Sequence, residues 1–181
     1  MKLISTSSTD VYVSHEIESM GEKFVLVTIT VDIPAPKKSY FYRGGFQWRL
    51  YGESVPLIVM LNFRDDISPS GGVLNEISFF ISETTQQTDG VNIHEVIKGL
   101  PVLSMDNQEI HEQFVHEEKG TFRLHLADKS MYCLFDNTES AIEVEINEDL
   151  SCLFDREKVF SGFVIRNLAD EEINLIQEAV S

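Results

Sequence analysis

The residues best suited to metal or acid–base chemistry are histidines that each precede a glutamate. These pairs are His15-Glu16, His94-Glu95, His111-Glu112 and His116-Glu117. Zinc proteases place two ligating histidines four residues apart, on one face of a helix. His111 and His116 are five residues apart, which is about 140° round a helix at 100° per residue. Two side chains placed in this way cannot share one ion without a partner element, and we interpret them as surface histidines.

Motifs for nucleophilic or nucleotide chemistry are absent from the sequence. It has no Gly-x-Ser-x-Gly, no Walker phosphate loop and no Gly-x-Gly-x-x-Gly. Its only cysteines, Cys133 and Cys152, lie in apolar runs without an adjacent base, which favours packed thiols over reactive ones. With one strand between them they would be about 9–10 Å apart, too far for a disulfide. We therefore predict a protein that is not an enzyme and uses no cofactor or metal.

The net charge of −16 is distributed unevenly along the chain. Residues 1–105 have a net charge of −4, whereas residues 106–181 have 18 acids, 6 bases and a net charge of −12. Negative charge repels phosphate backbones and anionic lipid surfaces. The charge therefore argues against nucleic acid and membrane partners and favours a basic protein.

Carboxylates of the C-terminal half are expected on the water-facing side of a sheet. Ala141–Ile146 alternates apolar and acidic residues, which predicts a strand with its acids turned outward. The predicted partner-binding residues are Glu143, Glu145, Glu148 and Asp149. A rigid sheet with outward carboxylates can attract and cover a cationic partner, as inhibitors and immunity proteins do. The alternative interpretation is an ordinary solvated strand face.

Lys37–Tyr51 is unlike its surroundings because it combines four bases with six aromatic residues and has no acid. Gly44-Gly45 could fold it into a hairpin with Tyr40–Arg43 and Phe46–Tyr51 as arms. It could form a recognition surface, on which Arg and Lys hold an anion while Trp48 stacks on a ring. It could equally be an amphipathic hairpin whose aromatic side chains belong to the core.

The segment Asp66-Ile67-Ser68-Pro69-Ser70-Gly71 resembles the Asp-x-Ser-x-x-Gly turn of PilZ domains, which are β-barrel receptors for cyclic diguanylate. The closing segment Gly162–Leu168, followed by a helix, is similar to the end of such a domain. The family's Arg-x-x-x-Arg is missing, since Arg43 and Arg49 are six residues apart. The resemblance implies an alternative function, a receptor that binds a cyclic dinucleotide. Its ligand-binding residues would be Arg43, Trp48, Arg49, Asp66, Ser68 and Gly71.

These residues are positioned by elements that the apolar periodicity predicts. The central stretch, Val55–Glu83, has two strand-like runs separated by a turn-rich break, and the first run is so apolar that we expect it to be buried on both faces. Phe24–Asp32 predicts another strand. A C-terminal meander is predicted from Thr121–Leu126, Met131–Asp136, Ala141–Ile146, Leu150–Phe154 and Lys158–Arg166.

Three helices are predicted from capping residues and apolar spacing. Asn92–Leu100 has an N-cap and a capping box, Asn107–Lys119 has a similar start, and Asp170–Val180 has acids in its first turn. The predicted fold class is α+β, a predominantly antiparallel sheet (a sandwich or a strongly twisted sheet) with two mid-chain helices and a C-terminal helix. We expect one domain over residues 1–181, in which halves 1–90 and 91–181 share a core.

The location is predicted from the cysteine content and from the absence of targeting signals. The N-terminus lacks the features of a secretory signal, and no apolar run approaches the roughly 18 residues of a membrane helix. Two cysteines without a secretory signal are typical of a reducing compartment. We therefore expect a soluble cytoplasmic protein.

Overall fold

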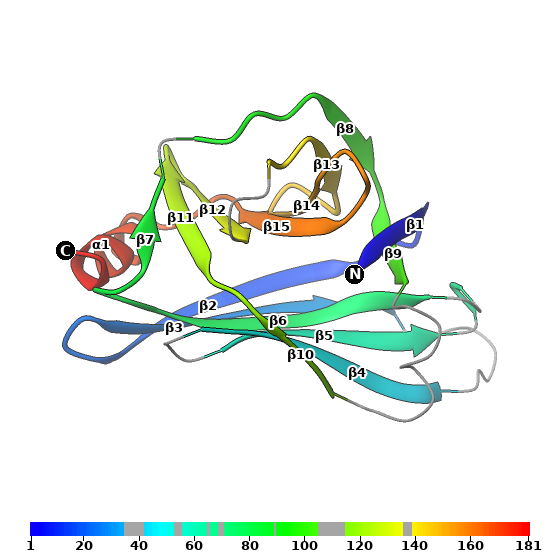
Figure 1. Cartoon of the computed structure of the whole chain (residues 1–181), viewed down its shortest axis with the longest axis horizontal. Helices are drawn as coiled ribbons and strands as arrows, with labels where there is room; N and C mark the ends of the chain where they lie inside the picture. Colours follow the sequence, from blue (N-terminus) through cyan, green and yellow to red (C-terminus); the bar gives the residue numbers. More distant parts are fainter. Residues whose placement is uncertain are drawn as a thin grey trace.

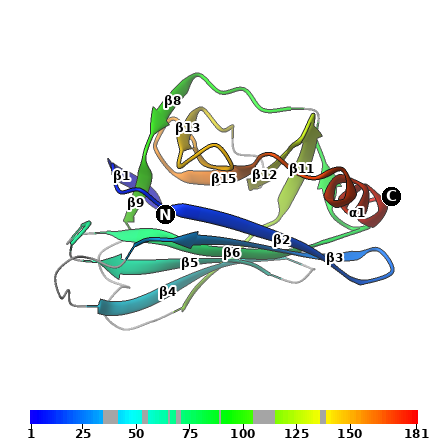
Figure 2. The same ribbon diagram turned by 180° about the vertical axis from the view of Figure 1, so that it is seen from behind.

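The fold consists of two β-sheets that face each other, with one helix packed at one end (Figures 1 and 2). The structure is a computed structural model that describes residues 1–34, 42–52, 56–64, 66–68, 71–88, 90–104, 115–135 and 139–181. Side chains of residues 42–44 lie outside this description. No helix among the described residues is long and apolar enough to cross a membrane.

The larger sheet, sheet A, has eight strands within the described part of the chain. They are β1 (Lys2–Ser7), β2 (Tyr12–Gly21), β3 (Phe24–Asp32), β4 (Tyr42–Tyr51), β5 (Leu57–Arg64), β6 (Gly72–Ser82), β9 (Leu100–Ser104) and β10 (Val115–Lys119). Their order is β1-β9-β6-β5-β4-β10, and the β2–β3 hairpin joins through β3 to β6. Sheet A is antiparallel except where β10 runs parallel to β4.

Sheet B has seven strands in the same described ranges. They are β7 (Gln86–Gln87), β8 (Glu95–Lys98), β11 (Phe122–Ala127), β12 (Ser130–Phe135), β13 (Ile142–Glu145), β14 (Leu150–Phe154) and β15 (Phe160–Ile165). Their order is β7-β11-β12-β15-β14-β13-β8, with parallel pairs at both edges. The predicted C-terminal strands are therefore present, but they do not form a simple meander, because β15 inserts between β12 and β14.

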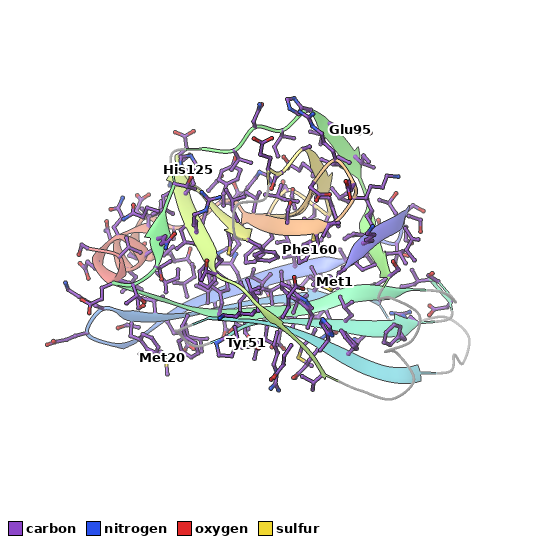
Figure 3. The ribbon with its side chains drawn as sticks, viewed as in Figure 1. Met1, Met20, Tyr51, Glu95, His125 and Phe160 are labelled. Carbon is purple, nitrogen blue, oxygen red and sulfur yellow. The ribbon has the colours of Figure 1, made fainter. Side chains whose placement is uncertain are left out.

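The core lies between the sheets and is rich in aromatic rings. Trp48 of β4 contacts Phe135 and Phe160 of sheet B, and Phe79 of β6 meets Phe163 edge to face. Figure 3 shows Phe160 between the two sheets. One hydrophobic cluster includes buried residues from Leu3 to Ala179, hence from both halves of the chain. The single-domain assignment itself stays a prediction.

Strand β5 is buried on one face rather than on both. Leu57, Val59 and Leu61 point into the core, while Ile58 and Met60 are half-buried on the other face of sheet A. Sheet B and the helix cover only the face of sheet A toward which Leu57, Val59 and Leu61 point (Figures 1 and 2). The expectation of a strand buried on both faces was therefore wrong. Strands β14 and β15 are buried at every residue, hence on both faces.

The predicted helix Asn92–Leu100 is wrong, because this segment passes from sheet B to sheet A as two strands. β8 pairs in parallel with β13, and β9 pairs with β1 and β6. Gly99 forms the step between them, with φ of 132°, and a Cβ at this position would lie 2.7 Å from the carbonyl oxygen of Ser7. Val96, which the helix would have buried, is 57 % exposed. Pairing with distant strands outweighs the local capping pattern.

The second mid-chain helix, Asn107–Lys119, is also contradicted where the structure describes it. Val115–Lys119 is strand β10, and residues 105–114 lie outside the described residues. The predicted hairpin at Gly44-Gly45 is replaced by the continuous strand β4, whose register against β5 shifts between Tyr42 and Gly45. The fold is therefore mostly β with two mixed sheets, rather than α+β with predominantly antiparallel sheet.

The C-terminal helix was predicted correctly and is the only helix among the described residues. α1 spans Asp170–Ala179, and Glu172 bonds back to the backbone N–H of Ala169. Its buried side chains, Ile176 and Ala179, belong to the core, and α1 contacts β2, β3 and β6. The helix thus closes one end of the space between the sheets (Figures 1 and 2).

Candidate functional site

The first predicted partner-binding residue, Glu143, lies inside the protein. Its side chain is buried and accepts hydrogen bonds from Ser151 Oγ, at 2.8 Å, and from the guanidinium of Arg166. The expectation that this residue faces water is wrong. Glu143 pairs with Leu153, so both lie on the face of sheet B that turns away from sheet A. This face is covered, because Val91 and Ile93 pack there on Leu134, Leu153 and Val164. Glu143 is therefore neutralised within the fold.

The other three predicted residues lie nearer to solvent. Glu145 is half-buried and its Oε1 is 3.4 Å from Nζ of the exposed Lys98. Glu148 is exposed. Asp149 accepts a hydrogen bond from Nδ2 of Asn167 at 2.8 Å, which joins the β13–β14 turn to the segment that leads into α1.

Strand register gathers several acidic segments at one end of sheet B. Met131 and Leu150 both pair with Ile165, so the β11–β12 turn, the β13–β14 turn and the exit from β15 lie together. The main-chain N–H of Leu168 donates to the carbonyl of Lys129 there. α1 begins at this point, which places its acidic first turn beside both turns.

The β2–β3 hairpin lies at the same end (Figures 1 and 2). His15 Nε2 is 3.3 Å from a carboxylate oxygen of Glu172 near the start of α1, and Lys23 Nζ donates to the main-chain carbonyl of Ser181 just beyond its end. The helix therefore runs along the hairpin. Glu22, in the turn of the hairpin, is exposed beside this contact, whereas Glu16 and Glu18 alternate with His15 on β2 and therefore point to the other face of sheet A.

We call this region the acidic end surface. It comprises Glu22, Asp128, Glu148, Asp149, Asp170, Glu171 and Glu178. Two lysines lie within it: Lys129 Nζ is 3.0 Å from Asp170 Oδ1, and Lys23 binds the C-terminal segment. Acids outnumber bases here, so the surface has a negative potential. Sequence reasoning identified only Glu148 and Asp149, because the other members come from the β2–β3 hairpin, the β11–β12 turn and α1.

The alternative, PilZ-like set of residues is not assembled around an open site. Trp48 is 4 % exposed, and its Nε1 donates to Glu118 Oε2 at 2.9 Å. Its ring is therefore part of the core and is not available for stacking on a ligand. Arg49 donates to Gln47 and lies 3.4 Å from Glu117. The side chain of Arg43 lies outside the described residues.

The turn after β5 uses its polar groups for its own structure. Arg64 is buried, and its Nε and Nη2 donate to the two oxygens of Asp66 at 3.0 and 2.6 Å. This hydrogen bonding holds the pKa of Asp66 below its ordinary value. Ser68 is buried, and a Cβ on Gly71 would lie 2.6 Å from Val102. These residues thus have structural roles that account for the Asp-x-Ser-x-x-Gly pattern.

The cysteines occupy equivalent places on either side of β15. Cys133 and Cys152 both pair with Phe163, so one strand separates them as predicted, and both are free and buried. Burial raises the pKa of both thiols, which disfavours the thiolate. Within the described ranges no group of three or more His, Cys, Asp or Glu could hold a metal ion.

The described residues thus form a mostly β, two-sheet fold with a concentration of carboxylates at its helical end. No known protein family matches the chain, and no curated protein is significantly similar to it.

Proposed function

We propose that the protein is a non-enzymatic binding module that recognises a protein partner with a basic surface. The observation that supports the proposal is the gathering of carboxylates from four separate segments into the acidic end surface, all of them exposed except the half-buried Asp149. Of the four partner-binding residues predicted from the sequence, Glu148 and Asp149 belong to this surface and remain proposed contacts. Glu143 is left out because Arg166 already neutralises it, and Glu145 is secondary because Lys98 is near.

The physical role of this surface is to steer and orient the partner. Exposed carboxylates raise the encounter rate with a cation more than they raise affinity, and their effect falls as salt screens them. The acids are mounted on ordered elements: β2 pairs with β3 along its length, with one register shift between Ser19 and Gly21, and α1 is anchored by Ile176 in the core. A preorganised surface loses little side-chain and loop freedom on binding, which favours affinity.

We further propose an inhibitor or immunity type of action, in which the acidic surface covers a cationic site of the partner. Carboxylates can occupy positions that phosphates or other anions would take on such a partner. The cytoplasm is the proposed location. This proposal is supported by the two cysteines, which are free, buried and one strand apart, because unpaired thiols are typical of proteins in a reducing compartment.

The experiment is affinity capture with the whole chain as bait, using a lysate of the cells that make it. Capture is compared at about 50 mM and about 300 mM salt, a range over which screening changes strongly. The test variant reverses three acids of the surface, Glu22→Lys, Glu171→Lys and Glu178→Lys. We expect a basic protein to be captured at low salt by the unchanged chain and to be lost with this variant.

A matched control has the same change in net charge at the other end of the molecule. Asp10→Lys, Glu95→Lys and Glu157→Lys all alter exposed acids outside the acidic end surface. The control should capture the same protein as the unchanged chain. Equal loss of capture in both variants would mean that only the total charge matters, and the proposed surface would be abandoned.

A further inference from the structure

A pocket of about 380 Å³ lies on the face of sheet B that turns away from the core. Its polar lining includes Asn92, His94, Arg123, Glu139, Ser140 and Arg156. Residues of the 90–94 segment, which crosses this side of the sheet between β7 and β8, form one wall (Figures 1 and 2). In Figure 3 the labelled His125 and Glu95 mark the two ends of this segment.

Arg123 of β11 is the unusual member of the pocket. Its Nε is buried and has no hydrogen-bond partner in the described part of the chain. More than nine in ten buried polar groups in proteins are satisfied, and an unsatisfied buried donor destabilises the fold. Because Nε itself is closed to solvent, a ligand in the pocket that Arg123 lines would accept from the Nη groups of the same guanidinium.

Arg156 contributes a second guanidinium, from the turn between β14 and β15. Neither it nor Arg123 forms an ion pair with any described residue, although the chain contains 30 acids. The other arginines with described side chains differ, because Arg49, Arg64 and Arg166 are each close to a carboxylate. Two arginines on one pocket without an acid partner among the described residues are unexpected in so acidic a protein.

The rest of the lining limits what could bind. Val91, Leu134 and Ala141 form an apolar wall suited to a short carbon skeleton. Glu139 is on the same lining and repels additional negative charge, as does the net charge of −16. Both features disfavour polyanions and favour a small molecule with one or two oxyanion groups.

We propose that this pocket binds the oxyanion group of a small metabolite, a carboxylate or a phosphate, between Arg123 and Arg156. Guanidinium groups donate in a planar fork that matches either group. Asn92 and His94 add polar groups on the same lining. The site is independent of the acidic end surface and does not rest on the proposed protein partner.

Isothermal titration calorimetry of the whole chain tests the site with two probes, inorganic phosphate and succinate. Each is titrated to about 20 mM in a buffer of constant ionic strength made up with chloride, a range that detects millimolar binding. Phosphate binding alone assigns a phosphate group, and succinate binding alone assigns a carboxylate. Absence of heat with both probes overturns the proposal.

Two variants and a control locate the binding. Arg123→Gln and Arg156→Gln should each weaken binding about tenfold or more, since each removes a charged donor. Lys119→Gln removes an equal charge from an exposed position on β10 and should leave binding unchanged. Circular dichroism checks the fold of each variant, and Arg156, in an exposed turn, keeps the test valid if Arg123→Gln does not fold. Unchanged binding in the arginine variants, or equal weakening by Lys119→Gln, overturns the site.

Discussion

The carboxylate of Glu143 and the guanidinium of Arg166 form an ion pair on the outer face of sheet B, away from the core between the sheets. Ser151 completes the group: its Oγ donates to Glu143 and accepts from Arg166 Nη1 at 2.7 Å. The three residues come from β13, from β14 and from the residue after β15. The group therefore ties the last part of the sheet together and uses the acid that was expected to face a partner.

Removing the carboxylate of Glu143 should destabilise the fold. Glu143→Gln leaves Arg166 without its counter-charge at a site of low exposure, and we expect a loss of about 2–4 kcal/mol in the free energy of unfolding. Glu145→Gln in the same strand is the matched control, because its partner Lys98 is 81 % exposed and such pairs contribute less than about 1 kcal/mol. Urea unfolding measures both, and equal losses would contradict the assigned role of Glu143.

The pair formed by Arg64 and Asp66 predicts a pH dependence of stability. Hydrogen bonding to Arg64 lowers the pKa of Asp66 in the folded state relative to the unfolded state. The stability it contributes is therefore present at pH values above the ordinary aspartate pKa, near 4, and is lost as the pH falls through the lowered value. At pH 7 we expect Asp66→Asn to cost about 1–2 kcal/mol, because Arg64 loses a charged acceptor.

The measurement for Asp66 is urea unfolding at several pH values. The difference between the unchanged chain and Asp66→Asn should shrink below about pH 4. Asp10→Asn controls for the loss of one carboxylate, since Asp10 has no hydrogen bond or ion pair with the described residues. A difference that stays constant down to the acid transition would show that the pair contributes no proton-linked stability.

Gly162 of β15 is a position where no side chain fits. A Cβ there would lie 2.2 Å from the carbonyl oxygen of Cys133, and this oxygen belongs to the backbone of the adjacent strand. Gly162→Ala should therefore destabilise the protein by about 3 kcal/mol or more. Gly21→Ala is the control, since Gly21 also has positive φ but nothing lies within 4 Å, and about 1–2 kcal/mol is expected. Similar losses in the two variants would contradict the close approach.

The elements that sequence predicted well are those whose apolar residues repeat with the period of a strand or a helix. Phe24–Asp32 coincides with β3, because Val25, Val27, Ile29 and Val31 all point into one core. α1 was predicted from its acids and its apolar stripe. In both segments the local pattern and the tertiary packing favour the same structure.

The errors came from segments whose structure depends on distant partners. Asn92–Leu100 has helical spacing, yet its strands pair with β13 on one side and with β1 and β6 on the other. Glu143 alternates with apolar neighbours as a water-facing residue would, but Arg166 comes from another part of the chain to cover it. The acidic end surface was missed for the same reason, since four segments meet there only after folding.

Trp48, the only tryptophan, separates the two interpretations of the basic aromatic stretch by direct spectroscopy. Its ring is packed between the sheets, 5.3 Å from Phe135 centroid to centroid. We expect native fluorescence emission at a shorter wavelength than in the urea-unfolded chain, with little quenching by acrylamide, because the indole is shielded from solvent. Trp48→Phe should cost about 1–3 kcal/mol, since it removes the hydrogen bond to Glu118 and leaves a smaller ring. Glu118→Gln keeps an acceptor oxygen and should cost less. A native emission maximum equal to that of the unfolded chain would mean that the ring is exposed, and the recognition-surface interpretation of Lys37–Tyr51 would be restored.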